Sequence, residues 1–412
     1  MAILFGDVQG DSGKLFGNQT GKRQSLRGLD GEINRIYGDA YTIEGSAKGG
    51  NDLLTGGDNS ESNYIYGDAY LLTGGGQGGN DEIRGGQNAG RLGGSSPWLT
   101  GNRLHGDAFE LRGNARGGND RMYGGDNSAY DYVYGDAFNM FDSSRGGNDQ
   151  LFGGAGTKYV RLVGDAANYM YGNAQGGNDQ LTGSAAAYRN LLMGDAYSLY
   201  DNSRGGNDLL RAGDNVKPVP GSGSYGYNQL FGDAVELWGT ARGGNDTLYG
   251  GNDSINYMVG DAYDLGNYTN NTGNTRGGND TLYGGGGDSV SYLVGDAYDV
   301  YGTAVGGNDI LFSGGGTDHL WGDVGFFYSD PNAVTFTAGR DTFVFGDSNG
   351  NDFIYDFRAG EDTIKVTMGS ISSFADLTIN VVGSDSLVQF NASNSATVYG
   401  VTNLSAADFI FG

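Results

Sequence analysis

The strongest constraint on this chain is a repeat that holds two acidic motifs at a fixed phase. Gly-Gly-Asn-Asp and Gly-Asp-Ala each occur nine times, they alternate along the sequence, and the unit recurs mostly every 29 residues. Such a period is typical of a solenoid, in which stacked coils align equivalent residues into columns. Each aspartate is therefore expected to lie beside its own copies in the neighbouring coils. Gly-Gly-Asn-Asp ends at Asp52, Asp81, Asp120, Asp149, Asp179, Asp208, Asp246, Asp280 and Asp309, and Gly-Asp-Ala is centred on Asp39, Asp68, Asp107, Asp136, Asp165, Asp195, Asp233, Asp261 and Asp296.

Columns of aspartate create an electrostatic problem. Coils of a β-solenoid lie about 4.8 Å apart, and two unit charges at that distance repel by roughly 3.5 kcal/mol at an effective dielectric constant of about 20. The columns therefore need cations between them, or they must face solvent. Gly-Gly-Asn favours a turn whose backbone carbonyls face inward, and carboxylate with carbonyl oxygens is a ligand set that suits Ca²⁺. We therefore predict bound calcium; the alternative is that Asp and Asn only form Asx-turns.

The composition narrows the classes of partner. The chain carries 49 acidic and 24 basic residues, a net charge of −25, so it is expected to repel nucleic acid and anionic membranes. It has no cysteine, which excludes disulfides and thiolate metal sites. No run of 18 apolar residues occurs, so membrane insertion is not expected. Residues 1–10 lack the basic and apolar regions of a signal peptide.

Alternation of apolar side chains predicts the strands of one coil. Residues 63–72 fit a longer strand around Gly-Asp-Ala, and residues 81–86 fit a shorter strand after Gly-Gly-Asn-Asp. The density of glycine disfavours helix. We expect two strands per coil and two parallel sheets that face each other across a narrow core. The predicted fold is all-β: a parallel β-roll or β-solenoid of about ten coils with a C-terminal β-rich cap.

Aromatic residues flank Gly-Asp-Ala in most units and are expected to stack in ladders. Sheet packing explains them, and a carbohydrate-binding stripe is the alternative. We interpret His105, in the same position, as a ladder residue and not as a ligand. The residue before the motif is aromatic at Tyr37, Tyr66, Tyr134 and Phe231, and the residue after it is aromatic at Tyr41, Tyr70, Phe109, Phe138, Tyr197, Tyr263 and Tyr298.

Lysine or arginine precedes Gly-Gly-Asn-Asp in six units. A column of cations beside a column of aspartates would offset charge at the turn, so we expect these residues to accompany the acidic column. They are Lys48, Arg116, Arg145, Arg204, Arg242 and Arg276.

The repeat degrades towards both ends, which divides the chain into three regions. We assign residues 1–37 to a degenerate N-terminal coil, 38–346 to the solenoid repeats that bind calcium, and 347–412 to the β-rich cap. Three insertions interrupt the period and are expected to form loops at the edges of the solenoid. They span residues 87–101, 214–228 and 264–275.

The motifs resemble the RTX (hemolysin-type) calcium-binding repeats, whose nonapeptide is Gly-Gly-x-Gly-x-Asp-x-apolar-x. Gly-Asn-Asp-x-Leu matches its second half, as in Gly244-Asn-Asp-Thr-Leu248. The resemblance implies a parallel β-roll in which the aspartate and the turn carbonyls bind Ca²⁺, so the implied metal ligands are the nine aspartates that close Gly-Gly-Asn-Asp. Ala-Arg often replaces the first two glycines of the family pattern, and the coil is longer than the family's. The Gly-Asp-Ala aspartates are left without an assigned role.

The C-terminal region resembles the segment of the same proteins that type I secretion machinery reads. The residues that carry this resemblance are Gly350-Asn-Asp-Phe-Ile-Tyr-Asp-Phe357, Gly360-Glu-Asp-Thr-Ile364 and Asp408-Phe-Ile-Phe-Gly412. It implies a secretion signal within residues 347–412 and export through that machinery without an N-terminal signal. The implied location is secreted, extracellular or at a bacterial cell surface.

No catalytic constellation stands apart from the repeats. The chain has two histidines, and it contains no P-loop, zinc motif or Ser-His-Asp set. We therefore predict no catalytic residue, no site for an organic cofactor and no enzymatic activity. The expected function is that of a secreted calcium-binding structural protein that folds in extracellular calcium and self-assembles, as a homo-oligomer or filament, into a surface layer, matrix or filament. The alternative is an extracellular carbohydrate-binding repeat module whose partner is a polysaccharide.

Overall fold

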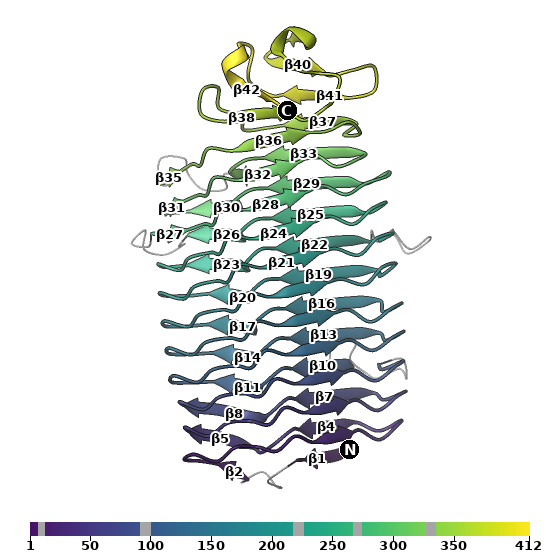
Figure 1. The fold of residues 1–412 in the computed structure, drawn as a ribbon, viewed down its shortest axis with the longest axis vertical. Helices are drawn as coiled ribbons and strands as arrows, with labels where there is room; N and C mark the ends of the chain where they lie inside the picture. Colours follow the sequence, from purple (N-terminus) through teal and green to yellow (C-terminus); the bar gives the residue numbers. More distant parts are fainter. Residues whose placement is uncertain (7–12, 91–99, 217–225, 267–273, 327–334) are drawn as a thin grey trace.

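The chain winds into a tall column of stacked coils, shown in the computed structural model of Figure 1. Three long parallel sheets of 15, 11 and 13 strands run the length of the column. Eleven coils therefore place a strand in all three sheets, and the predicted all-β parallel solenoid is confirmed. The structure describes residues 1–6, 13–90, 100–216, 226–266, 274–326 and 335–412.

The 15-stranded sheet collects the strands that end just before the Gly-Asp pair. Its parallel strands, in order, are β1 (Ala2–Phe5), β4 (Asn34–Tyr37), β7 (Ser62–Tyr66), β10 (Gly101–His105), β13 (Tyr130–Tyr134), β16 (Tyr159–Val163), β19 (Arg189–Met193), β22 (Tyr227–Phe231), β25 (Ile255–Val259), β29 (Val290–Val294), β33 (Thr317–Trp321), β37 (Asn351–Ile354) and β41 (Ser395–Val398).

The 11-stranded sheet collects the strands that begin just after the Gly-Asp pair. They are β2 (Lys14–Leu15), β5 (Thr42–Gly45), β8 (Ala69–Gly74), β11 (Ala108–Leu111), β14 (Ala137–Met140), β17 (Ala166–Met170), β20 (Ala196–Leu199), β23 (Ala234–Trp238), β26 (Ala262–Gly266), β30 (Ala297–Tyr301) and β34 (Val324–Phe326).

The 13-stranded sheet collects the short strands that follow Gly-Gly-Asn-Asp. They are β3 (Ser25–Arg27), β6 (Leu53–Thr55), β9 (Glu82–Arg84), β12 (Arg121–Tyr123), β15 (Gln150–Phe152), β18 (Gln180–Thr182), β21 (Leu209–Arg211), β24 (Thr247–Tyr249), β28 (Thr281–Tyr283), β32 (Ile310–Phe312), β36 (Thr342–Phe345), β38 (Thr363–Val366) and β42 (Phe409–Phe411). A small fourth sheet contains β27 (Thr275–Arg276), β31 (Thr303–Val305) and β35 (Thr335–Thr337).

The prediction of two strands per coil is wrong, because Gly-Asp-Ala forms a corner between two strands. β7 ends at Tyr66 and β8 begins at Ala69, and the Gly-Asp pair between them bends the chain from one sheet into the next. The corner still bonds to the next coil, since the N–H groups of Asp68 and Ala69 both donate to the carbonyl oxygen of Asp107, at 2.9 and 3.1 Å. The hydrogen-bond ladder between coils therefore continues round the bend. For this reason the alternation of side chains in the sequence is the same as that of one continuous strand.

Glycine at this corner is required by the close approach of successive coils. A β-carbon added to Gly106 would lie 1.6 Å from the carbonyl oxygen of Gly135 and 2.1 Å from Asp120 Oδ2. Real β-carbons do not approach other heavy atoms so closely, so only glycine fits there without displacing the backbone of the next coil.

Two large apolar cores fill the column, and a smaller cluster that includes Tyr134, Met193 and Phe231 packs beside them. One lies between the 15- and 13-stranded sheets and stacks residues such as Ile65 and Ile83. The other lies behind the 11-stranded sheet and stacks small and branched residues such as Ala69 and Leu72. Because these cores are separate, the Gly-Asp corner between them has room for polar side chains.

The parallel stack ends in a region of different pairing. β40 (Asp385–Gln389) is antiparallel to both β39 (Thr378–Val382) and β41, so a hairpin closes the 15-stranded sheet at the C-terminal end of the column (Figure 1). Two 3₁₀ turns, Phe374–Asp376 and Ala406–Asp408, also lie in this region. The insertions predicted as loops fall largely outside the described residues.

Candidate cation-binding strip

Both series of aspartates lie inside the column. The Gly-Asp-Ala aspartates from Asp68 to Asp296 are fully buried, and the Gly-Gly-Asn-Asp aspartates from Asp81 to Asp309 are at most 3% exposed. Asp39 and Asp52 begin the two columns and are buried as well. We name the remaining sixteen residues the acidic strip: Asp68, Asp81, Asp107, Asp120, Asp136, Asp149, Asp165, Asp179, Asp195, Asp208, Asp233, Asp246, Asp261, Asp280, Asp296 and Asp309.

Each Gly-Asp-Ala aspartate connects the corner to the Gly-Gly-Asn-Asp turn of its own coil. Asp107 Oδ1 accepts the N–H of Gly118 at 2.9 Å, and Asp136 Oδ1 accepts the N–H of Gly147 at 2.9 Å. Both donors are the second glycine of the motif. The other oxygen, Oδ2, is buried and has no N–H or hydroxyl donor at Asp107, Asp136, Asp165, Asp195, Asp233, Asp261 and Asp296. Neighbouring carboxyl groups of this column, such as Asp107 and Asp136, lie close enough for a shared proton to bridge them.

Each Gly-Gly-Asn-Asp aspartate connects its coil to the preceding one. Asp120 Oδ1 accepts the N–H of Asp81 at 2.6 Å, and Asp149 Oδ1 accepts the N–H of Asp120 at 2.7 Å. These charge-assisted bonds run the length of the column. The second oxygen is again buried without a donor, at Asp81, Asp120, Asp149, Asp179, Asp208, Asp246, Asp280 and Asp309.

The two columns and the backbone share one narrow space. The β-carbon position of Gly106 lies within 2.1 Å of both the Gly135 carbonyl oxygen and Asp120 Oδ2, and that of Gly117 lies 2.6 Å from Asp107 Oδ2. Glycine therefore lets carboxylate oxygens of both columns approach backbone carbonyls. These oxygen-only donors fit Ca²⁺, which would be held by the Oδ2 atoms of the acidic strip together with glycine carbonyls and would supply the missing positive charge.

Burial raises the pKa of the strip carboxyls. It raises the pKa of Asp120 and of Asp179 to about 8, with burial the largest cause and a backbone hydrogen bond opposing it. At Asp107 burial raises the pKa well above the ordinary carboxyl value, and the carboxylates of Asp120 and Asp136 raise it further. A buried carboxylate without a partner is costly. The strip is therefore stable only when protons or cations neutralise it.

Side chains alone do not complete a metal site in the described part of the chain. No group of three or more His, Cys, Asp or Glu is arranged there to hold a metal ion. A cation in the strip would need the glycine carbonyls as additional ligands, as the sequence pattern of turn glycines suggested.

The basic column does not accompany the acidic strip as expected. Lys48 and Arg116 are exposed, and their backbones form bridges with the same position of neighbouring coils. Among the described residues, none of the six predicted basic residues forms an ion pair with an aspartate of the strip. The turn directs the basic side chain to solvent and the aspartate inward, so the strip lacks neutralising partners along its length.

A second buried polar column was missed from the sequence. Asn34 Nδ2 donates to Asn63 Oδ1 at 2.8 Å, Asn63 Nδ2 donates to Asn102 Oδ1 at 2.9 Å, and Asn102 Nδ2 donates to Asp131 Oδ1 at 2.8 Å. The sequence pattern that could have predicted this column is an asparagine four residues before the glycine of Gly-Asp-Ala. We name this column the asparagine ladder; its asparagines are Asn34, Asn63, Asn102, Asn190, Asn228 and Asn256.

The predicted aromatic ladders are present. The rings of Tyr37 and Tyr66 stack with centroids 5.0 Å apart, and those of Tyr41 and Tyr70 stack at 4.9 Å. His105 stacks on Tyr66 at 4.9 Å, and burial lowers its pKa to about 3, so it is a neutral member of the ladder.

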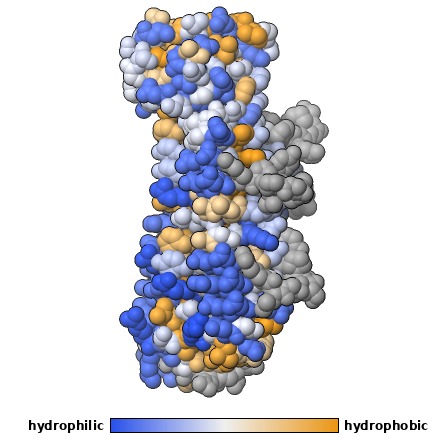
Figure 2. All heavy atoms as spheres, turned by 90° about the vertical axis from the view of Figure 1, so that its right-hand side faces the viewer, coloured by the Kyte–Doolittle hydropathy of each residue, from blue (hydrophilic) through white to orange (hydrophobic). Residues whose placement is uncertain are grey.

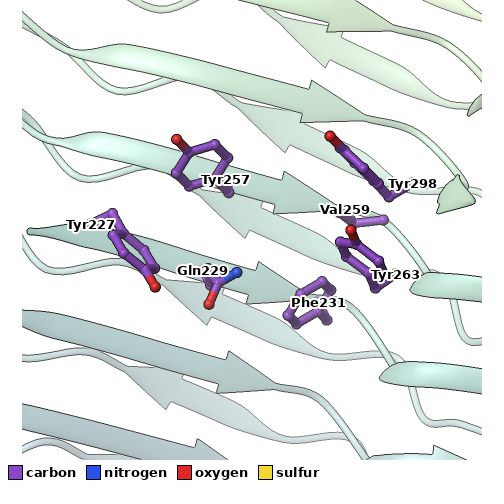
Figure 3. A pocket seen from close by; sticks show the side chains of 7 residues that line it. All are labelled: Tyr227, Gln229, Phe231, Tyr257, Val259, Tyr263 and Tyr298. Atoms are coloured by element: carbon purple, nitrogen blue, oxygen red, sulfur yellow. The ribbon is translucent and has the colours of Figure 1, made fainter. Parts of the chain in front are cut away.

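One outer groove forms where a ladder is interrupted. Val235 stands in register with Tyr263, where other coils carry a ring. The groove has a volume of about 330 Å³ (Figure 3). Tyr257 and Tyr263 are 40% and 37% exposed. The lining residues are Tyr227, Gln229, Phe231, Tyr257, Val259, Tyr263 and Tyr298.

Comparison with known proteins adds no family. No protein-family model matches the chain, and no curated protein matches it. The resemblance to RTX repeats therefore stays a prediction from the motifs. In the part of the chain that the structure describes, no helix has the length and apolar character needed to cross a membrane.

Proposed function

We propose that this protein is a secreted calcium-binding structural protein whose solenoid folds when Ca²⁺ enters the acidic strip. One observation carries the proposal: two adjacent columns of buried aspartates each leave one carboxylate oxygen without a hydrogen-bond donor. Cations are the simplest partners for such oxygens, since no basic side chain among the described residues forms an ion pair with an aspartate of the strip.

Calcium suits this position for two reasons. The available donors are carboxylate and carbonyl oxygens, which Ca²⁺ prefers and which zinc and copper bind poorly. Calcium binding would also be coupled to folding, because the aspartates converge only in the coiled state. A chain of this kind would stay unfolded in a cytosol low in calcium and fold after export. The resemblance of the tail to type I secretion signals supports an extracellular location.

The two ends of the column support head-to-tail self-assembly. β1, β2 and β3 are each first in the order of their sheets, and β39 is last in the 15-stranded sheet. At the N-terminal end Phe16 and Leu29 are 58% and 57% exposed, and in β39 Val381 and Val382 are 57% and 60% exposed. Figure 2 shows apolar side chains gathered at the lower, N-terminal end. Contact between unlike ends propagates into a filament unless it closes.

A calcium titration followed by circular dichroism tests the folding proposal. In EGTA at about pH 9, where the strip carboxyls are ionised, we expect little β signal and an expanded chain, and millimolar Ca²⁺ should produce the β signal and compaction. Magnesium at the same concentration serves as the control, since it demands a smaller octahedral site and keeps its waters. An equally folded and compact protein in EGTA would contradict the proposal.

Light scattering with calcium tests assembly. Phe16→Ser and Val381→Ser each remove an exposed apolar side chain from one end, so each should reduce the scattering mass. Ile310→Ser is the matched control, because Ile310 is 39% exposed on the side of the column. A monomeric wild-type protein at high concentration in calcium would remove assembly from the proposed function and leave calcium-dependent folding.

A second candidate function, carbohydrate binding, is favoured by the outer groove alone. Exposed tyrosine rings beside an amide at Gln229 are suited to a neutral sugar. Titration calorimetry with neutral oligosaccharides should then show binding that Tyr257→Ala weakens. Tyr283→Ala is the control, since Tyr283 stacks between Tyr249 and Phe312 in the 13-stranded sheet. Absence of binding to any neutral oligosaccharide would remove this candidate.

A further inference from the structure

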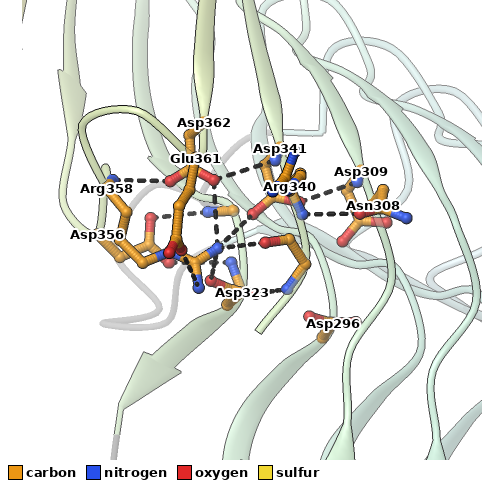
Figure 4. A network of polar contacts seen from close by, with 12 residues as sticks. Asp296, Asn308, Asp309, Asp323, Arg340, Asp341, Asp356, Arg358, Glu361 and Asp362 are labelled. Carbon is orange, nitrogen blue, oxygen red and sulfur yellow. Dashed lines mark hydrogen bonds and ion pairs between the residues drawn. The ribbon is translucent and has the colours of Figure 1, made fainter. Parts of the chain in front are cut away.

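The C-terminal end of the two aspartate columns carries a fixed positive charge. Arg358, between β37 and β38, places its guanidinium across Asp323 and Asp341 (Figure 4). The Gly-Gly-Asn-Asp column continues by one more residue, because the N–H of Asp341 donates to Asp362 Oδ1 at 3.1 Å. The Nη2 atom of Arg358 lies 3.0 Å from Asp323 Oδ2 and 3.7 Å from Asp341 Oδ2. The same atom lies 3.2 Å from Asp362 Oδ1 and 2.5 Å from the carbonyl oxygen of Gly339. Four oxygen atoms therefore surround one cationic nitrogen.

Asp323 occupies the position that Asp296 occupies in the preceding coil. The N–H of Gly339 donates to Asp323 Oδ1 at 2.7 Å, as the N–H of Gly307 donates to Asp296 Oδ1 at 2.5 Å. The N–H of Asp296 in turn donates to the carbonyl oxygen of Asp323 at 3.1 Å. Gly322-Asp323-Val324 is thus a degenerate copy of the Gly-Asp-Ala corner.

Asp341 likewise occupies the position that Asp309 occupies one coil earlier. The N–H of Asp309 donates to Asp341 Oδ1 at 2.9 Å, as the N–H of Asp280 donates to Asp309 Oδ1 at 2.7 Å. The Arg358 contacts are therefore made to the equivalents of Asp296 Oδ2 and Asp309 Oδ2. Those two oxygens are buried and accept no hydrogen bond; Asp341 Oδ2 accepts none either, but it has the Arg358 guanidinium 3.7 Å away as a charge partner.

We propose that the Arg358 guanidinium fills the last cation position of the acidic strip, so that metal binding stops one coil short of the C-terminal cap. This inference rests on the proposed calcium function. It explains why this coil neutralises its two buried aspartates with a side chain, whereas no aspartate of the acidic strip forms an ion pair with a basic residue in the described part of the chain. The same ion cluster attaches the segment after β37 to the column, because Asp362 and Gly339 belong to different coils and contact one guanidinium.

The test counts the calcium ions bound per chain, by equilibrium dialysis of the folded protein against Ca²⁺. Arg358→Gln removes the charge and keeps a polar side chain, so it should bind one more calcium than the wild type. Arg358→Lys keeps a cation there and should bind the wild-type number. Arg340→Gln removes an exposed charge from the same coil and should leave the number unchanged.

A second pair of variants keeps the inference testable if Arg358→Gln fails to fold. Asp323→Asn leaves the guanidinium in place and should keep the wild-type calcium count, because no metal lies at that coil. Asp296→Asn, its equivalent one coil earlier, should lose at least one calcium. Equal loss in the two variants would overturn the inference.

The outcomes separate the inference from the function on which it rests. A wild-type protein that binds no calcium removes both. A wild-type protein that binds several calcium ions, with an Arg358→Gln variant that folds and binds the same number, overturns the role of Arg358 and leaves the calcium function standing.

Discussion

The acidic strip and the asparagine ladder are two buried polar columns in the same coils, but their side chains differ in how they find hydrogen-bond partners. An asparagine carries a donor and an acceptor, so Asn63 accepts from Asn34 and donates to Asn102, and each amide is paired with its neighbours in the column. An ionised aspartate only accepts, so every residue of the strip except Asp68 is left with one oxygen that has no donor. The asparagine column needs nothing from outside the protein, whereas the aspartate column needs protons or cations.

The largest difference between the columns is expected with pH in the absence of divalent ions. Burial raises the pKa of Asp120 and Asp179 to about 8, above the ordinary carboxyl value. Because the folded state holds these protons more tightly than the unfolded chain, their stabilising contribution is complete below the ordinary carboxyl pKa and is lost as the pH rises through about 8. The asparagine ladder has no such dependence, apart from Asp131.

Circular dichroism in chelator measures this effect. The metal-free protein should keep β structure near pH 5 and lose it by about pH 9, and millimolar Ca²⁺ should maintain the fold at both pH values. If the chelated protein had the same stability at pH 5 and pH 9, neither protons nor divalent ions would be needed to neutralise the aspartates of the strip.

Substitution within the strip is the next largest effect. Asp179→Ala and Asp165→Ala come from the two columns of one coil, and both should raise the calcium midpoint of folding and lower the stability in calcium by about 3 kcal/mol. Glu61→Ala removes an exposed carboxylate and is the matched control. If only Asp179→Ala shifts the midpoint, the Gly-Asp-Ala aspartate is not a ligand and the strip is a single column.

Substitution within the asparagine ladder should be milder and independent of calcium. Asn102→Ala removes bonds to Asn63, Asp131 and the backbone of Gly86. We expect a loss of about 2 kcal/mol in the free energy of unfolding, with an unchanged slope of stability against calcium concentration. If Asn102→Ala shifted the calcium midpoint of folding as far as Asp179→Ala does, the asparagine ladder would contribute to calcium binding in the same way as the acidic strip.

The most local effect on stability is expected at Asp131, the aspartate that interrupts the asparagine ladder. Burial raises the pKa of Asp131 to about 6, so its contribution to stability is lost as the pH rises through that value. Asp131→Asn does not titrate, so relative to the wild type it should become more stable by about 2 kcal/mol between pH 4 and pH 8. Chemical denaturation in saturating calcium at the two pH values measures this difference. An unchanged difference would mean that Asp131 is ionised at no cost.

The periodicity of the sequence predicted the solenoid and the alignment of the Gly-Gly-Asn-Asp aspartates in a column, because a repeat at fixed phase must stack. It left open whether that column faces solvent or lies inside. It did not separate a bend from a strand at Gly-Asp-Ala, since the hydrogen-bond ladder passes through Asp68 and Ala69 without a break. The direction of a side chain leaving a turn is not set by spacing, which is why Arg116 was expected beside the aspartates. The role of Arg358 could not be predicted from the sequence, because its segment lies outside the repeat and no periodic pattern places it beside the aspartates.

The central claim is that metal ions lie between the two aspartate columns. Anomalous scattering from crystals of the full chain grown with Ca²⁺ tests it most directly. We expect a row of anomalous peaks along the strip, within bonding distance of residues such as Asp107, Asp120 and Asp136, and ending before Asp323 and Arg358. A well-ordered strip with no anomalous peaks, its carboxyl groups paired only with one another, would contradict it.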